Sequence, residues 1–473
     1  MKLIFRGHDD RYAIEQSLLA FFPEERPVYE TAEAGEDDCA YVSLTEGKRY
    51  ATGVTSIHYH GKTARGVSRA VLTDAPDEYE RERLRQRALK LSFFKAARDI
   101  TGVTPSWGAL TGIRPGKLAR AMLEQGKTER ETDRVLRDTY FVSPERRRLA
   151  IETARAGLKA KRDLRPDEIS LYVGIPFCPT RCAYCSFISA SHRMLKILDD
   201  YLALLVEDVK STFALIHDLG KTVASVYIGG GTPTTLDAQG LDKLLSTVAA
   251  CTDVTALEEF TLEAGRPDTI TAEKLGIARR CGVTRISVNP QTLSDKVLAN
   301  IGRRHTAADF FRAYEIAAAS GIKDINTDLI VGLPGDDFKT FSHTLDEIVA
   351  LDPSNITVHT FCFKRAADMS KKQGTEFVPD AQNAAKCIQY SQLTLPGAQY
   401  KPYYMYRQKN AVGNLENVGY AKPGSACMYN IYMMEEMHSI FGVGAGAVTK
   451  LVEHTGGAPR MKRIFAPKYP YEY

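Results

Sequence analysis

The sequence lacks the features that would mark a membrane-bound, secreted or fibrous protein. The 473 residues include one tryptophan, and the sequence shows no internal repeat. Its longest apolar run is well short of the roughly 20 residues that a membrane helix needs. The first residues, MKLIFRGHDDRY, meet charge too early for a secretory signal. Nine cysteines without a regular framework favour free thiols or metal ligands in a reducing compartment over disulfides. We therefore expect a cytoplasmic protein without a membrane span.

Charge does not identify a partner, because the formal net charge is only +4. A local excess occurs in residues 114–165, which hold 15 lysines and arginines against 8 aspartates and glutamates. Such a basic helical run is usually a solvated face. The alternative is attraction for a polyanion, either nucleic acid or a substrate with several carboxylates.

Patterning along the chain predicts four regions. Residues 1–115 combine strand-like runs such as AYVSLTEG with a long helical stretch, which predicts an α+β domain. A basic helical segment and linker follow over 116–167. From 168 to 365, six short apolar runs alternate with helix-length amphipathic stretches, which predicts a partial (β/α)6 barrel of parallel strands. We expect residues 366–473 to form a mainly helical cap, so the fold class is α/β.

Three cysteines follow the first strand of the predicted barrel, in CPTRCAYC. Cys178, Cys182 and Cys185 have the spacing Cys-x3-Cys-x2-Cys at a strand end, where barrels of this class place their chemistry. Zinc usually takes four ligands, often in separated pairs, and no second pair follows. A 4Fe-4S cube held by three thiolates would leave one iron open for a small molecule. A cluster of structural cysteines is the plain alternative.

Polar residues and glycines occur at the ends of the next predicted strands. GGGTPT occupies residues 229–234, Glu263 ends the third run, Gln291 closes the fourth, Arg303 lies shortly beyond it, and Asp328 lies in the fifth. Each of them alone is as well explained by a structural role. Together they suit an amino acid joined to a nucleoside, which needs a cation for its carboxylate and polar acceptors for its ammonium and hydroxyl groups.

These motifs resemble a known family. CPTRCAYC, GGGTP, LEAGRPD, NPQ and NTDLIVGLPG match in order the pattern of radical S-adenosylmethionine enzymes. The flanks YVGIPFC, LDPSNITVHTF, ENVGYAKPGSACMYN and FGVGAGA resemble the oxygen-independent coproporphyrinogen III oxidase (dehydrogenase) group, and most closely its HemZ-like branch. The resemblance covers about residues 170 to 455 and leaves the first 160 residues without a motif.

The resemblance implies a 4Fe-4S cluster, S-adenosylmethionine and a tetrapyrrole substrate. The cluster would be held by Cys178, Cys182 and Cys185, and the methionine part of the cofactor would be contacted by Gly229, Gly230, Gly231, Thr232 and Glu263. Arg303 would bind the carboxylate of the cofactor, and Gln291 and Asp328 would bind its ribose. Tyr184 would pack beside the cluster and the adenine. Tyr172 would be the catalytic residue, as a contact to the substrate or in a proton relay. In this group, a 5'-deoxyadenosyl radical initiates the oxidative decarboxylation of coproporphyrinogen III propionates to vinyl groups, with an electron donor such as flavodoxin or ferredoxin.

Two departures from the group bear on the substrate. Established members have a histidine two residues after the tyrosine of the first strand, where this chain has Gly174, and a further cysteine after the cluster motif, where it has Phe187. The same family includes heme-binding chaperones and anaerobic heme-degrading enzymes, so heme handling is the alternative function. His305, His359 and His438 are then candidate axial ligands. Nucleic-acid modification rests only on the basic segment, and we do not expect a nucleic-acid partner.

Overall fold

The computed structural model describes residues 1–473 apart from 30–37, 74, 113, 186–195, 363–379 and 454–459. The chain divides into two compact units, Met1–Ile151 and Glu152–Tyr473. None of the helices in the described ranges combines the length and apolar character needed to cross a membrane.

The first unit is an α+β domain, as predicted. Its sheet has the order β2-β1-β3-β4-β5, with parallel pairing around β1 and antiparallel pairing from β3 to β5. Helix α2 packs against β4 and β5, and its Asp77 cap accepts a hydrogen bond from the Glu80 N–H. The elements of this unit are β1 (Lys2–Arg6), α1 (Arg11–Phe21), β2 (Val28–Tyr29), β3 (Cys39–Glu46), β4 (Tyr50–Tyr59), β5 (Lys62–Val71), α2 (Glu78–Thr101), α3 (Pro115–Glu124) and α4 (Glu129–Asp138). Helix α5 (Pro144–Asp163) carries the chain into the second unit.

The second unit contains the predicted barrel. Strands β6 to β11 pair in parallel in chain order, so the six predicted βα units are confirmed. They are β6 (Glu168–Ile175), β7 (Thr222–Gly230), β8 (Glu259–Glu263), β9 (Arg285–Ser287), β10 (Asp324–Val331) and β11 (Asn355–Thr360). Nearly every residue of β6 and β10 is buried, which is typical of parallel strands covered on both faces.

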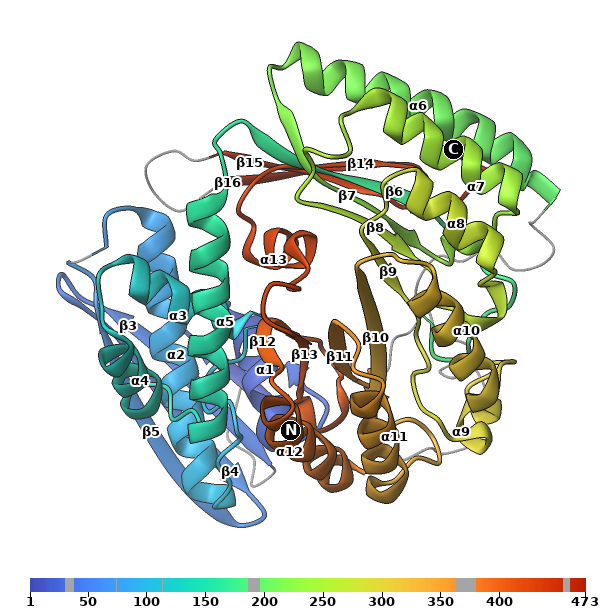
Figure 1. Cartoon of the computed structure of the whole chain (residues 1–473). Helices are drawn as coiled ribbons and strands as arrows, with labels where there is room; N and C mark the ends of the chain where they lie inside the picture. Colours follow the sequence, from blue (N-terminus) through green and yellow to red (C-terminus); the bar gives the residue numbers. More distant parts are fainter. Residues whose placement is uncertain (30–37, 74, 113, 186–195, 363–379, 454–459) are drawn as a thin grey trace. The chain divides into compact units, whose positions relative to one another are not determined.

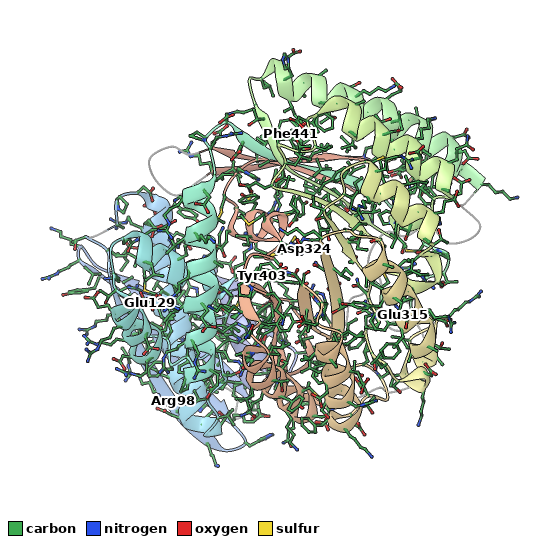
Figure 2. The ribbon with its side chains drawn as sticks, viewed as in Figure 1. Arg98, Glu129, Glu315, Asp324, Tyr403 and Phe441 are labelled. Carbon is green, nitrogen blue, oxygen red and sulfur yellow. The ribbon has the colours of Figure 1, made fainter. Side chains whose placement is uncertain are left out.

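Helices cover the outer face of this curved sheet (Figure 1). They are α6 (Leu198–Asp218), α7 (Ala238–Cys251), α8 (Ala272–Arg280), α9 (Asp295–Asn300), α10 (Ala307–Ala319) and α11 (Phe338–Ala350), with short 3-10 turns η2 (Pro233–Thr235) and η3 (Pro267–Thr269). Figure 2 shows Glu315 on the outer helix α10, whereas Asp324 and Tyr403 lie on the inner side of the sheet.

The C-terminal region is not the mainly helical cap that we expected. Strands β12 (Lys401–Arg407) and β13 (Glu416–Ala421) extend the sheet beside β11, and β14 (Ile440–Val443), β15 (Val448–Glu453) and β16 (Arg460–Phe465) extend it beside β6. The described part also holds α12 (Ala381–Gly397), η5 (Val412–Asn414) and α13 (Met428–Glu435), the last on the concave side of the sheet (Figure 1). The physical reason is that an open barrel leaves unpaired backbone groups at both edges, and these strands pair with them.

Candidate functional site

A cavity of about 810 Å³ lies at the carboxyl ends of the parallel strands. This is the end at which barrels of this class carry their sites. Gly229 does not border it. The other predicted positions do: Tyr172, Cys178, Cys182, Tyr184, Cys185, Gly230, Gly231, Thr232, Glu263, Gln291, Arg303 and Asp328. The fold thus brings together residues that lie up to about 150 positions apart in the sequence.

The three cysteines lie on the loop that follows β6. The Cys178 Sγ atom is 3.3 Å from Oγ1 of Thr232, and the Cys185 N–H donates to the Cys182 carbonyl at 3.0 Å. Burial raises the pKa of the Cys178 thiol to about 11, so its thiolate needs a positive partner such as iron.

These thiols fit a cluster better than a single ion. In the described ranges, no group of three or more His, Cys, Asp or Glu side chains is placed to hold one metal ion. A 4Fe-4S cube binds each thiolate at a different iron, so its ligands need not converge on one point. Three thiols on one loop at the edge of a cavity satisfy that requirement and would hold three of the four irons.

Two buried arginines lie close to this loop. Arg303 donates to the Asn289 carbonyl at 2.8 Å, and its Nε atom is buried without a hydrogen-bond partner among the described residues. Arg266 forms a 2.8 Å ion pair with Asp268 and lies 3.8 Å from the Cys182 Sγ atom. Such buried cations suit an anionic ligand or the sulfurs of a cluster. Sequence reasoning identified Arg303 and missed Arg266, although the motif LEAGRPD contains it.

Glu263, the last residue of β8, accepts hydrogen bonds from neutral groups. The Tyr227 hydroxyl donates to its Oε1 atom at 2.5 Å, and the Gly230 N–H donates to Oε2 at 3.1 Å. Burial raises the pKa of Glu263 to about 7, and these two donors partly oppose that rise. Gly229 makes room for the carboxylate, since a Cβ atom there would lie 2.9 Å from it. A cationic ligand such as an ammonium group would stabilise the charged form.

Asp328 and Gln291 form the next part of the wall. Asn289 donates from Nδ2 to the Asp328 carboxylate at 2.8 Å and accepts from the Asp328 N–H at 3.1 Å. Gln291 has a left-handed backbone with φ of 67°, held by hydrogen bonds to β10 on both sides. Its Oε1 atom and the Ser287 Oγ atom are buried without partners within the described part of the chain. Unpaired buried polar atoms in a cavity suit a hydroxyl-bearing ligand. Asn289 and Ser287 were missed, although NPQ contains the first.

Tyrosines form much of the remaining wall. Tyr172, Tyr227 and Tyr429 stack with one another, the closest pair of rings being 4.4 Å apart. Tyr404 and Tyr406 of β12 also stack and border the cavity. Burial raises the pKa of Tyr172 far above its usual range, so its hydroxyl stays neutral. The wall thus offers flat apolar faces with hydroxyl donors.

One of the three candidate histidines reaches the cavity. His359 borders it, with Nε2 3.8 Å from the Asp328 carboxylate and Nδ1 3.4 Å from the Tyr406 hydroxyl. His305 and His438 are buried outside its wall, and burial lowers the pKa of these imidazoles to about 4 and about 3. Of these three histidines, His359 is therefore the one placed to meet a ligand in this cavity.

The two positions that depart from the coproporphyrinogen group have different outcomes. Gly174 of β6 lies against the segment that follows β14. In that segment Gly444 has φ of 92°, and a Cβ atom on Gly444 would lie 2.5 Å from the Gly174 carbonyl oxygen. The Tyr201 hydroxyl donates to the same carbonyl at 2.7 Å. The glycine-rich segment FGVGAGA therefore makes a close backbone approach to β6. Phe187 lies outside the described residues.

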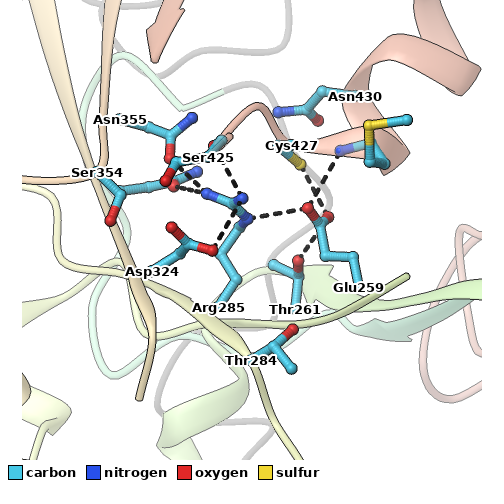
Figure 3. Close-up of polar contacts among 12 residues, drawn as sticks. Glu259, Thr261, Thr284, Arg285, Asp324, Ser354, Asn355, Ser425, Cys427 and Asn430 are labelled. Carbon is cyan, nitrogen blue, oxygen red and sulfur yellow. Dashed lines mark hydrogen bonds and ion pairs between the residues drawn. The ribbon is translucent and has the colours of Figure 1, made fainter. Parts of the chain in front are cut away.

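A polar cluster at the opposite ends of the strands supports the wall (Figure 3). Buried Arg285 pairs with Glu259 at 3.0 Å and with Asp324 at 3.5 Å. Glu259 accepts from the Cys427 thiol at 3.0 Å and from the Met428 N–H at 3.1 Å. Helix α13 begins at Met428, so this cluster positions the helix that carries part of the cavity wall.

Comparison with known proteins agrees with this geometry. The family model described as the radical SAM superfamily matches residues 172–348. The chain is 35% identical to the oxygen-independent coproporphyrinogen-III oxidase-like protein HemZ of Bacillus subtilis, over 98% of this chain and 93% of that protein. It is 30% identical to the heme chaperone HemW of the same organism, over 59% of this chain and 70% of HemW.

A solved structure shares the fold. Coproporphyrinogen III oxidase (HemN) from Escherichia coli, a radical SAM enzyme, matches with a TM-score of 0.50 and 21% identity, covering 62% of this chain and 67% of that chain. The protein is a radical SAM enzyme whose cofactors are a 4Fe-4S cluster and S-adenosylmethionine. The chain belongs to the radical SAM superfamily and, within it, to the HemZ-like branch of the oxygen-independent coproporphyrinogen III oxidase family.

Proposed function

We propose that this enzyme decarboxylates propionate side chains of coproporphyrinogen III to vinyl groups, giving protoporphyrinogen IX. The observation that carries the proposal is the cavity itself, where a three-cysteine loop faces a wall of stacked tyrosines. Its volume of about 810 Å³ is large enough for an extended organic ligand. Flat aromatic faces suit a macrocycle better than a small polar metabolite. The names of the relatives, a coproporphyrinogen oxidase-like protein and a heme chaperone, support a tetrapyrrole.

We assign the cluster to Cys178, Cys182 and Cys185. When bound, cluster and S-adenosylmethionine supply a 5'-deoxyadenosyl radical that can remove hydrogen from an unactivated carbon. Glu263, held by neutral donors, would accept the ammonium group of S-adenosylmethionine, and Arg303 would donate to its carboxylate.

The other wall residues have proposed roles that follow from their contacts. Gln291 and Asp328 would bind the ribose hydroxyls, and Tyr184 would pack beside the cluster and adenine. The backbone of residues 230–232 would approach the methionine part, while Gly229 acts by leaving room for Glu263. Tyr172 stays neutral, so it can donate a hydrogen bond to the substrate or take part in a proton relay.

Electrons must enter and leave for each vinyl group formed. A donor such as flavodoxin or ferredoxin would supply one electron to the cluster, and the substrate would give one to a one-electron acceptor as carbon dioxide departs. We also propose that the enzyme works in the cytoplasm. None of the nine cysteines, all of which the structure describes, forms a disulfide, which suits a reducing compartment.

The test is an anaerobic assay of the reconstituted full chain. It contains S-adenosylmethionine, a reductant and coproporphyrinogen III, and chromatography follows 5'-deoxyadenosine and the porphyrin products. Vinyl products together with substrate-dependent 5'-deoxyadenosine are expected. If cofactor cleavage occurs without any vinyl product, this substrate assignment is wrong.

Heme handling is the second candidate, favoured by the placement of His359 in the cavity beside Asp328. An imidazole whose other nitrogen is near a hydroxyl is a suitable axial ligand. A heme titration of the full chain separates the two functions. A visible spectrum that changes in His359→Ala, with no vinyl product in the enzyme assay, would favour heme handling.

A further inference from the structure

Arg266 is a buried cation whose orientation is fixed within the protein. It follows β8 in the motif LEAGRPD, and its side chain is 3% exposed. The Nε atom donates to one carboxylate oxygen of Asp268 at 3.0 Å, and Nη2 donates to the other at 2.8 Å. Two parallel hydrogen bonds of this kind fix the plane of a guanidinium group. The protein itself therefore sets the direction in which the remaining nitrogen points.

That remaining nitrogen faces the cysteine loop. Nη1 donates to the Thr180 carbonyl at 3.2 Å and lies 3.8 Å from the Cys182 Sγ atom. Thr180 lies between Cys178 and Cys182 in the sequence. Arg266 thus contacts both the backbone of this loop and one of its thiols, and all three of its guanidinium nitrogens have a protein partner.

The second buried arginine of the cavity, Arg303, differs in its partners. Its Nε atom is buried without a hydrogen-bond partner among the described residues, which suits an added anionic ligand. The nitrogens of Arg266 already have partners in Asp268 and the cysteine loop. Arg266 is therefore better placed to act on the Cys182 sulfur than to bind the carboxylate of a ligand.

Positive charge beside a cluster sulfur changes how easily the cluster is reduced. Reduction takes one electron from a donor protein and leaves the cluster one charge more negative. Hydrogen bonds to the sulfurs and a nearby cation stabilise this reduced form, and burial limits screening by salt. We propose that Arg266 raises the reduction potential of the 4Fe-4S cluster through its contact with Cys182, and that Asp268 limits this rise.

This inference rests on the proposed assignment of the cluster to Cys178, Cys182 and Cys185. It adds a positioning residue that acts on the cluster by charge and does not touch the substrate.

The test measures the reduction potential of the cluster in the full chain, reconstituted without oxygen. Redox titration is followed by electron paramagnetic resonance in the absence of S-adenosylmethionine, so that cofactor binding does not contribute. Arg266→Gln removes the positive charge. At a fixed potential its ratio of reduced to oxidised cluster should fall about tenfold, which is a shift of about 59 mV to lower potential. Asp268→Asn removes the opposing negative charge, so its potential should shift to a higher value.

Arg280→Gln is the matched control. Arg280 also pairs with an aspartate, Asp242, at 2.8 Å, but its side chain is 63% exposed and it lies outside the cavity wall. Solvent and salt screen such a charge, so the potential of this variant should equal that of the wild type. Iron analysis of each variant establishes whether the cluster is bound.

The opposite signs of the two shifts separate an electrostatic role from a structural one. If Arg266 only holds the loop in place, the potentials of Arg266→Gln and Asp268→Asn should shift in the same direction or not at all, and either result overturns the inference. An unchanged potential in iron-loaded Arg266→Gln likewise overturns it and leaves the proposed function standing. Weaker binding of S-adenosylmethionine in that variant would then assign Arg266 to the cofactor carboxylate.

Two further outcomes keep the test decisive. If Arg266→Gln takes up no iron, Asp268→Asn decides, because it retains Arg266: a higher potential supports the inference and an unchanged one overturns it. If the wild type itself takes up no cluster, the cluster assignment in the proposed function is wrong together with the inference.

Discussion

Replacing Arg285 by methionine should destabilise the second unit strongly. The Arg285 side chain is 3% exposed, and its guanidinium pairs with Glu259 and Asp324. It also donates to the Asn326 side chain at 2.7 Å and to the Ser425 carbonyl at 2.9 Å. Methionine fills a similar volume but supplies no donor. The variant therefore removes the buried cation that both carboxylates share, and the 4.0 Å contact of Asp324 with the exposed Lys323 is a weak substitute.

The expected loss of unfolding free energy is about 3–5 kcal/mol, the cost of breaking a buried pair by removing one partner. Arg280→Met is the matched control, because Arg280 also pairs with a carboxylate at 2.8 Å but is 63% exposed at its side chain. An exposed pair contributes about 0–1 kcal/mol, so the difference between the two variants isolates the effect of burial.

Urea unfolding followed by two probes provides the assay. The single tryptophan, Trp107, is buried in the first unit, so its fluorescence reports that unit. Far-ultraviolet circular dichroism reports both units. The Arg285→Met transition should move to lower urea in the dichroism signal and stay in place in the fluorescence signal. A loss below about 1 kcal/mol, or one equal to that of Arg280→Met, would refute the reasoning about this buried cluster.

Three further predictions concern the cavity. The raised pKa keeps Glu263 neutral below about pH 7. The Kd for S-adenosylmethionine, measured by calorimetry, should therefore fall about tenfold per pH unit up to that pH and level off above it. The Glu263→Gln variant should bind S-adenosylmethionine more weakly and without this pH dependence. Cys182→Ala should lose the brown cluster absorbance and its iron, whereas Cys251→Ala should keep both; retained iron in the first would contradict the ligand assignment. Gly444→Ala should lower the free energy of unfolding, measured by chemical denaturation, by about 1–3 kcal/mol or more, because of backbone strain and contact with β6. Gly220 has φ of 64° and lies in open space, so Gly220→Ala should lower it by only about 1 kcal/mol. Equal losses in the two variants would show that the contact with β6 is unimportant.

Periodicity was sufficient to predict the barrel and much of its site. Each βα unit is local, and parallel strands must end at the same edge, so Glu263, Gln291 and Asp328 could be placed together from strand ends alone. The C-terminal strands could not be predicted in this way. β14 pairs with β6, whose residues lie about 270 positions earlier. A pattern of apolar residues indicates which face a strand buries but not which distant edge it joins.

The same limit applies to residues whose importance depends on a partner. Arg266 is one of many arginines in the sequence, and only the fold places it 3.8 Å from the Cys182 sulfur. The chemical argument comes from a contact across the fold.

The two ends of β8 show how the barrel separates stability from binding. Glu259 and Glu263 are four residues apart in one strand, so both lie on the same face. Glu259 has a buried arginine, Arg285, as its partner. Among the described residues, the partners of Glu263 are the Tyr227 hydroxyl and the Gly230 N–H, and burial raises its pKa to about 7. The first carboxylate is neutralised within the protein and fixes α13, whereas the second gains most from an added cation. A ligand ammonium group at the cavity end of β8 would therefore complete the charge balance that the fold has already achieved at the other end.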